Sequence, residues 1–131
     1  NFDIPARRKP EDLWHGDAEM VQAWIAGQKP ECFGFVALDS TGTVAGFSFV
    51  SMREELLTHA PSAHLEVLAV APHVRRSGLG TTLSNAAETE ARKRGAKTIT
   101  LHVFGKNTRA RALYAKLGYD EELIRAIKDL E

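Results

Sequence analysis

One segment constrains this chain more than any other: an apolar run that ends at a proline and is followed, after two arginines, by two glycines. The run covers residues 65–70, Pro72 ends it, and Gly78 and Gly80 stand where the next helical pattern begins. Proline cannot donate to a sheet, so the strand stops there. The pattern predicts a buried strand that passes through a tight loop into a helix, as in an α/β protein.

The loop after this strand is suited to an anion. Gly78 and Gly80 let the backbone approach without a Cβ in the way, and the free N–H groups of the first helical turn point outward. Arg75 and Arg76 add positive charge, and guanidinium groups match the oxygens of a pyrophosphate. A Gly-x-Gly turn is also common as pure structure. No Walker P-loop and no Gly-x-Gly-x-x-Gly occurs, which disfavours nucleoside triphosphates and NAD.

Length and composition set outer bounds on the function. The chain has 131 residues and 44% hydrophobic content, which fits a single domain over 1–131. Lys plus Arg equals Asp plus Glu at 17 each, so we expect neither a nucleic-acid nor a membrane partner. The one cysteine, Cys32, rules out an internal disulfide and a zinc cluster, and it fits a cytoplasmic protein with an inert thiol. The chain starts at Asn1, so we expect an upstream element to be missing.

Periodicity predicts the remaining elements. Residues 39–42 carry turn chemistry between two β-rich runs, which predicts a hairpin. Glycines follow the predicted helices as C-terminal caps. The expected helices cover 11–26, with a break at Gly16-Asp17, and 81–94 and 107–117; the expected strands cover 33–38, 44–52, 65–70 and 98–103. By propensity alone, the tail fits a helix slightly better than a strand.

Two motifs give the chain a family resemblance. Arg-Arg-Ser-Gly-Leu-Gly at 75–80 resembles the Arg/Gln-x-x-Gly-x-Gly/Ala signature of the GNAT superfamily of N-acetyltransferases, and Leu-Ala-Val-Ala-Pro at 68–72 resembles the strand end before it. The run 107–119 resembles the Asn-x-x-Ala-x-x-Leu-Tyr-x-Lys-x-Gly-Phe/Tyr segment of the same superfamily. The resemblance extends from residue 33 to residue 119.

The resemblance implies a fold. It is an α/β fold of the α+β type, with a mixed, mostly antiparallel sheet, a splayed central strand pair and flanking helices. The strand at 65–70 would splay from the strand at 98–103. The tail at 122–130 would be a strand, against its propensity, and the usual first strand would precede Asn1.

The resemblance also implies acetyl-CoA as the acyl donor, without a metal. Main-chain groups of Leu68 and Val70 would pair with the pantetheine arm. Asn107 would either bind that arm or cap its helix. The pyrophosphate would lie on a loop made of Arg75, Arg76, Ser77, Gly78, Leu79 and Gly80.

The chemistry needs an acid, an oxyanion donor and a base. Tyr114 aligns with the residue that protonates the coenzyme sulfur in similar enzymes, although it could simply pack beside its neighbours. The N–H of Leu68 is the candidate oxyanion donor. His64 and Glu66 lie two apart on one strand, so both are candidate bases, or simply polar residues of a half-exposed face. Alternation would point Glu66 and Leu68 the same way, which slightly favours Glu66 as the base.

These features predict an N-acetyltransferase that acts on a primary amine of a small molecule, amino acid or peptide. The acceptor pocket would involve the N-terminal helix and residues 53–60, where Glu54 and Glu55 could attract a cation. The alternative is a catalytically silent acyl-CoA-binding sensor or interaction domain. A nucleic-acid-binding domain is disfavoured by the zero net charge. The sequence does not decide between a monomer and a homodimer.

Overall fold

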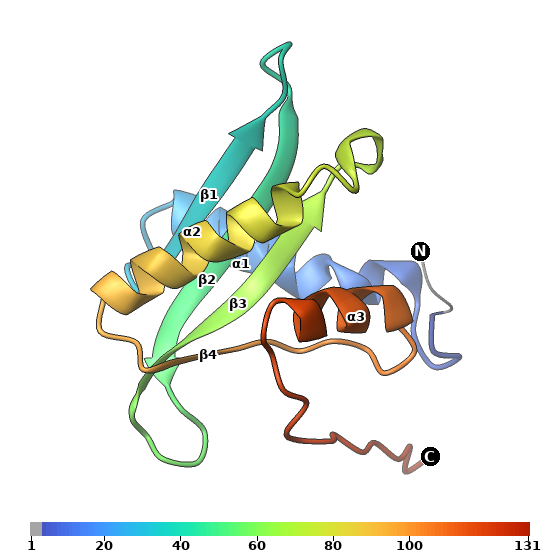
Figure 1. Cartoon of the computed structure of the whole chain (residues 1–131). Helices are drawn as coiled ribbons and strands as arrows, with labels where there is room; N and C mark the ends of the chain where they lie inside the picture. Colours follow the sequence, from blue (N-terminus) through green and yellow to red (C-terminus); the bar gives the residue numbers. More distant parts are fainter. Residues whose placement is uncertain (1–3) are drawn as a thin grey trace. The chain divides into compact units, whose positions relative to one another are not determined.

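The computed structural model describes residues 4–131 (Figure 1). The elements follow one another as η1 (Pro10–Leu13), α1 (His15–Ile25), β1 (Cys32–Leu38), β2 (Val44–Glu54), β3 (Pro61–Val70), η2 (Pro72–Val74), α2 (Leu79–Lys93), β4 (Thr98–Thr100) and α3 (Thr108–Lys116). The chain divides into two compact units. Residues 4–102 contain the sheet, α1 and α2, and residues 103–131 contain α3.

The sheet has the strand order β1-β2-β3-β4. The first three strands are antiparallel, and β4 runs parallel to β3. Figure 1 shows α2 across one face of this sheet and α1 behind the other. The predicted mixed, mostly antiparallel sheet with flanking helices is therefore confirmed.

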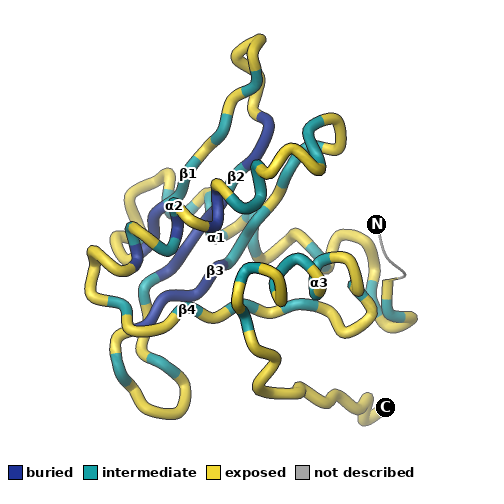
Figure 2. The backbone as a smooth tube through the Cα atoms, viewed as in Figure 1, coloured by how far each residue is buried: buried dark blue, intermediate teal, exposed yellow. Residues whose placement is uncertain are grey.

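The apolar core lies between α2 and the sheet. Figure 2 shows buried backbone in α2 and in the strands that it crosses. Ala87 and Ala91 lie one helical turn apart on α2, and their small side chains let the helix approach the sheet closely. The core is formed by Phe33, Val50, Ala63, Leu65, Ala87 and Ala91, with Phe35, Met52, Leu68, Ala96, Ile99 and Leu101 packed against it. On the opposite face, the Trp24 ring of α1 lies 5.1 Å from the Phe49 ring of β2.

A β-bulge interrupts β3 at Glu66. Phe49 of β2 pairs with Val67, but the next residue, Val50, pairs with Leu65, so Glu66 has no partner of its own. The extra residue reverses the alternation of side chains after it. Leu65 and Leu68 therefore both pack in the core on the α2 face, although they are three residues apart. The expectation that Glu66 and Leu68 point the same way is wrong, because simple alternation fails at the bulge.

The predicted hairpin is confirmed, and one carboxylate stabilises its turn. Asp39 accepts hydrogen bonds from the Thr41 N–H at 2.8 Å, the Thr41 hydroxyl at 2.6 Å and the Thr43 N–H at 3.1 Å. The Thr41 hydroxyl, followed by these two backbone donors, lowers the pKa of Asp39 to about 2. Asp39 is therefore a structural residue of the turn.

Other elements differ from expectation at their ends. β3 starts at Pro61, four residues earlier than predicted, and β4 ends at Thr100 rather than at residue 103. The first helix breaks at Trp14, between η1 and α1, and not at Gly16-Asp17. Asp17 instead lies in the first turn of α1, where a carboxylate suits the positive end of the helix dipole.

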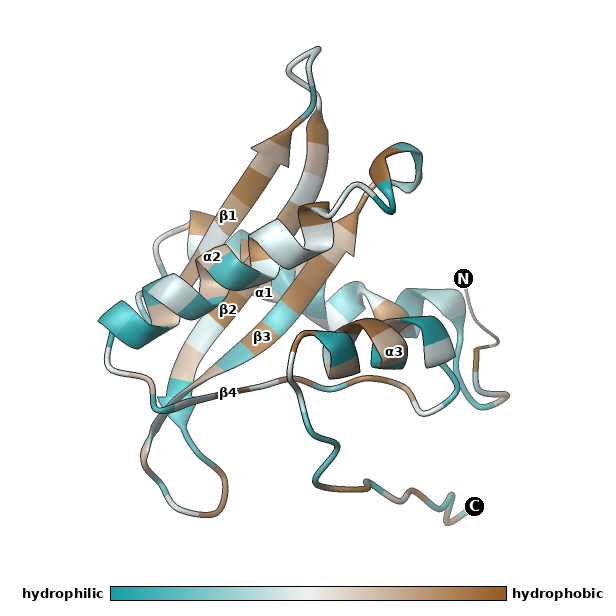
Figure 3. Ribbon diagram, viewed as in Figure 1, coloured by the Kyte–Doolittle hydropathy of each residue, from teal (hydrophilic) through white to brown (hydrophobic). Residues whose placement is uncertain are grey.

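The tail does not form the predicted strand. Residues 119–131 carry neither helix nor strand. Apolar and polar residues mix along this segment (Figure 3), but Ile124 is 97% exposed and Leu130 is 91% exposed. With these side chains in water, the segment gains little stability from apolar burial. The expected strand before Asn1 lies outside the described residues.

Candidate functional site

The site begins where β3 and β4 part. The two strands pair only from Ser62 opposite Thr98 to His64 opposite Thr100, whereas β3 continues to Val70. Within residues 4–102, the β4-side edge of β3 is therefore open beyond His64. This is the predicted splay between the two central strands.

Backbone hydrogen bonds show which N–H groups face this open edge. The Pro61 carbonyl accepts from Lys97 on the β4 side, and the Ala71 N–H donates to Ala45 on the β2 side. Alternation from the second bond places the N–H groups of Leu68 and Val70 away from β2. Alternation counted from the Lys97–Pro61 bond would instead have placed the N–H of Val67 at the open edge. The extra residue in the bulge shifts the alternation by one position. The two predicted backbone groups thus face the open edge.

The loop before α2 exposes further backbone donors. The first bond of α2 runs from the Thr82 N–H to the Gly78 carbonyl at 3.0 Å, so the N–H groups of Leu79, Gly80 and Thr81 precede it. Gly78 has φ +84°, a left-handed conformation that favours glycine. Arg76 has φ 70°, which costs a residue with a Cβ about 1–2 kcal/mol. Such a strained, charged turn at a helix N-terminus is the geometry of an anion site.

The Ser77 and His73 side chains of this region are engaged within the chain. The Ser77 hydroxyl donates to the Val74 carbonyl at 2.5 Å. His73 lies on η2 with its Nε2 3.5 Å from a carboxylate oxygen of Asp39. Both the hydroxyl and the backbone N–H of Ser77 therefore donate to Val74, and His73 connects the loop to the hairpin turn.

Glu66 is held by two partners on β2. The Ser51 hydroxyl donates to its carboxylate, and the Arg53 guanidinium forms an ion pair with it. Arg53 Nε also donates to the Ser51 hydroxyl at 3.0 Å. The Glu66 side chain is only 10% exposed, so this charge is compensated inside the protein. Burial and then the Glu66 charge raise the pKa of Asp17 on α1, which places both acids on the same side of the sheet.

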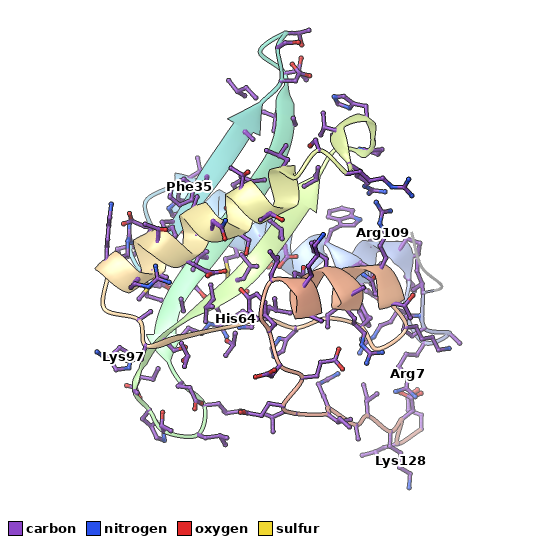
Figure 4. All side chains as sticks on the ribbon, in the orientation of Figure 1. Arg7, Phe35, His64, Lys97, Arg109 and Lys128 are labelled. Carbon is purple, nitrogen blue, oxygen red and sulfur yellow. The ribbon has the colours of Figure 1, made fainter. Side chains whose placement is uncertain are left out.

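His64 is buried at the point where the strands part (Figure 4). It is 5% exposed, and its Nδ1 lies 2.8 Å from the Thr100 hydroxyl. Its ring centroid lies 4.7 Å from that of His102. Burial, followed by the Arg53 charge, lowers the pKa of His64 to about 4. The imidazole is therefore neutral and has a lone pair available at neutral pH.

Sequence reasoning did not find Thr100, His102, Ser51 or Arg53. They reach His64 and Glu66 only through strand pairing, for example Ser51 opposite His64. The one available signal was the alternation of Thr98, Thr100 and His102, which predicted a shared face but not the strand beside it. Glu54 and Glu55, the proposed cation attractors, are occupied in their own loop: Glu54 contacts His59, and Glu55 accepts from Leu57 N–H.

Tyr114 and Asn107 belong to the unit formed by residues 103–131. Tyr114 lies on α3 and packs edge-on against Tyr119 at 5.8 Å between ring centroids. Burial raises the pKa of Tyr114, so its hydroxyl keeps its proton at neutral pH. Asn107 caps α3 by accepting from the Ala110 N–H at 3.2 Å, which is the capping alternative.

Residues 4–131 contain neither a cluster of metal ligands nor a membrane-spanning helix. No group of three or more His, Cys, Asp or Glu side chains is arranged to hold a metal ion there. None of the helices in this part of the chain is long and apolar enough to cross a membrane.

Comparison with known proteins places the chain in a family. The uncharacterized N-acetyltransferase YhfO of Bacillus subtilis is 38% identical over 98 residues, 75% of this chain, which spans only 58% of that relative. The ribosomal protein bS18-alanine N-acetyltransferase of Escherichia coli is 31% identical over 123 residues, 94% of this chain and 78% of that one.

A solved structure of aminoglycoside N-acetyltransferase AAC(6')-Iy in complex with CoA has a similar fold. Its TM-score is 0.75 at 23% identity, with 92% of this chain and 83% of that one covered. A sequence model of the acetyltransferase (GNAT) family matches residues 2–119. The chain therefore belongs to the GNAT family of acetyltransferases.

Proposed function

We propose that this protein transfers an acetyl group from acetyl-CoA to a primary amine. The observation that carries the proposal is the combination of an open strand edge and an anion-binding helix start on one continuous segment. The edge begins at Leu68, and the helix start is the loop 75–80. A pantetheine arm joined to a pyrophosphate needs both of these features in this order.

The residues present fit the acyl donor. The N–H groups of Leu79, Gly80 and Thr81, with Arg75 and Arg76, would hold the pyrophosphate. Leu68 and Val70 would pair with the amides of pantetheine through the backbone groups that face the open edge. Acetyl-CoA supplies the activated thioester. Asn107 is occupied as a helix cap, so any contact with the donor would use its remaining amide N–H groups.

The base is best assigned to His64. An alkyl amine has a pKa of about 10, so it must lose a proton before or during its attack on the thioester. Glu66 is already neutralised by Arg53 and hydrogen-bonded by Ser51, and it lies on a bulge that turns it away from Leu68. His64 has a free lone pair at the point where the strands part. Strand alternation had slightly favoured Glu66 as the base, but the bulge and the two partners on β2 favour His64.

Two groups would act on the negative charges that form on the carbonyl oxygen and on the sulfur. The Leu68 N–H would donate to the carbonyl oxygen as it becomes negative. The Tyr114 hydroxyl would protonate the departing thiolate, and its raised pKa keeps the proton available for that step. Asp17 provides a carboxylate on the α1 side of the sheet, which suits a cationic acceptor.

The acceptor is proposed by class. Relatives act on an alanine of ribosomal protein bS18, and structural neighbours act on aminoglycosides. Both acceptors carry primary amines, so an alanine-started peptide and an aminoglycoside are the first compounds to test. We place the enzyme in the cytoplasm, which agrees with its free, buried cysteine.

An acceptor screen tests the function. Purified protein is mixed with acetyl-CoA and each amine, and thiol release is measured together with CoA binding by calorimetry. We expect release that depends on the amine. Tyr114→Phe should lower turnover by roughly 10² to 10⁴ while CoA affinity is kept, and Tyr119→Phe, its neighbour in the aromatic pair, is the matched control. CoA binding without release with any amine would favour the silent sensor domain.

A further inference from the structure

Hydroxyl side chains reinforce the short contact between β3 and β4. The Ser62 hydroxyl lies 2.8 Å from the Thr98 hydroxyl, two register positions before the fork, which is the His64–Thr100 pair where β3 and β4 part. At the fork itself, His64 Nδ1 lies 2.8 Å from the Thr100 hydroxyl. The two contacts are equivalent in register, but only the second involves an imidazole, whose proton can lie on either ring nitrogen.

The number of protons available decides the direction of the second contact. The Thr100 hydroxyl also lies 3.4 Å from the Ala63 carbonyl, which can only accept. A hydroxyl has one proton to donate and two lone pairs. Both contacts are hydrogen bonds only if Thr100 donates to Ala63 and accepts from His64. In that arrangement His64 carries its proton on Nδ1, and Nε2 carries the lone pair.

We propose that Thr100 is a positioning residue that fixes His64 in the tautomer with a free Nε2 lone pair. The inference rests on the proposed function, because it gives His64 the role of base. Thr100 does not touch the substrate. It acts by holding the ring proton on Nδ1, so that Nε2 is ready to accept.

The surroundings of His64 are consistent with a neutral, oriented ring. Three charged or titratable groups face it: Arg53 on β2, Glu66 on β3 and His102 just after β4. The His102 ring packs against it at 4.7 Å with the planes at 58°, which restricts rotation about the Cβ–Cγ bond. No hydrogen-bond partner for His64 Nε2 is found among the described residues.

The proton then has a defined path. As the amine nitrogen bonds to the thioester carbon, one of its protons passes to His64 Nε2, and the ring becomes a cation. The C–S bond breaks, and the thiolate takes the Tyr114 proton. Throughout these steps the Nδ1 proton stays on His64 and is donated to the Thr100 oxygen. Afterwards His64 releases the Nε2 proton to solvent, and the Tyr114 oxygen takes a proton from solvent.

The experiment reads the tautomer directly. In the full chain labelled with 15N on histidine, NMR distinguishes a protonated ring nitrogen from one with a lone pair, and His64→Asn assigns the signals among the five histidines. We expect the wild type to be protonated on Nδ1. Thr100→Val should give a mixture of both tautomers, and Thr100→Ser should restore the wild-type signals.

Kinetics on the acceptor found in the screen provide the second readout. Thr100→Val should lower kcat about five- to tenfold, as expected for one neutral hydrogen bond, with the KM for acetyl-CoA within about twofold. Thr98→Val is the matched control, because it removes the equivalent hydroxyl two register positions away from the His64–Thr100 pair. It should keep the wild-type tautomer and kcat.

Two results would overturn the inference: a wild-type His64 protonated on Nε2, or a Thr100→Val protein that keeps the pure Nδ1-protonated form. These outcomes are independent of the proposed function, since NMR reads the resting protein without an acceptor. Absence of acetyl transfer by the wild type would count against the function, while the tautomer result would still decide the role of Thr100.

Discussion

The two faces of the sheet are built from different kinds of residue. On the α2 face, apolar side chains such as Val50 and Leu65 pack against the alanines of α2. On the α1 face, beside β4, His64 and Glu66 are buried or nearly buried polar groups with hydrogen-bond partners. Burying such groups costs free energy unless they are paired. The α1 face therefore carries paired titratable groups beside β4, and the α2 face carries the apolar core.

The largest expected effect tests the chemistry on the α1 face. His64→Asn should lower kcat by roughly 10² to 10⁴, the range for removing a positioned base. The KM for acetyl-CoA should change little, because the donor is held by backbone and loop groups. His59→Asn, in an exposed loop, is the matched control and should match the wild type in steady-state kinetics. Equal rates for both variants would leave the α1 face without a base.

The next effect concerns stability against pH. The pKa of His64 falls from 6.5 to about 4 on folding, so the unfolded chain binds one more proton between these values. The free energy of unfolding should therefore decrease as the pH is lowered from about 6.5 to 4, by about 3 kcal/mol in total.

Chemical denaturation at pH 7 and pH 4.5 checks this loss, with His64→Asn as the reference that lacks the titrating group. The variant should lose less stability than the wild type over this interval. The same low pKa means that a rise of kcat/KM between pH 6 and 8 would report loss of a proton from the amine and not from His64. An equal pH response of both proteins would show that His64 is not buried in neutral form.

A smaller effect tests the packing on the α2 face. A Cβ added at Gly46 would lie 2.7 Å from Leu83 Cδ1 and 3.1 Å from the Ala69 carbonyl oxygen. Gly46→Ala should therefore cost about 1–3 kcal/mol in free energy of unfolding, measured by denaturation. Gly16→Ala on α1, where a Cβ meets nothing within 4 Å, should be neutral or slightly stabilising. A stable Gly46→Ala protein would mean that this face is less tightly packed than described.

Sequence patterns were enough for one face and not for the other. The hairpin, the loop before α2 and the apolar faces of β1 and β2 follow from local periodicity and turn chemistry. The bulge at Glu66 does not, because residues 65–68 read as an uninterrupted strand until the partner strand is known. The contact between His64 and Thr100 joins residues 36 apart, and only strand pairing brings them together.

The tail shows the limit of predicting local structure from a family resemblance. Residues 122–130 were expected to form a strand only from the family resemblance, since propensity slightly favoured a helix. Neither forms, and apolar side chains such as Ile124 and Leu130 bury little surface. Local preference without burial is too weak to order a segment.

The smallest expected effect distinguishes the two candidate bases. Glu66→Gln keeps the size of the side chain and its place in the bulge but removes the charge that Arg53 and Ser51 stabilise. Arg53 is 43% exposed, so water can solvate it once its partner is lost, and the change in stability should stay below about 1 kcal/mol. Because the Glu66 charge raises the pKa of His64, its loss should make His64 a slightly weaker base.

We therefore expect Glu66→Gln to lower kcat by less than about tenfold, with an unchanged pH profile between pH 6 and 8. Ser51→Ala is the matched variant, since it removes one hydrogen bond to the same carboxylate and keeps the charge; its kcat should fall even less. A loss of 10² or more for Glu66→Gln, with a flattened pH profile and a nearly normal His64→Asn enzyme, would return the role of base to Glu66. In that case the Glu66 carboxylate would accept the proton from the amine. His64 and Thr100 would serve mainly to join β3 to β4.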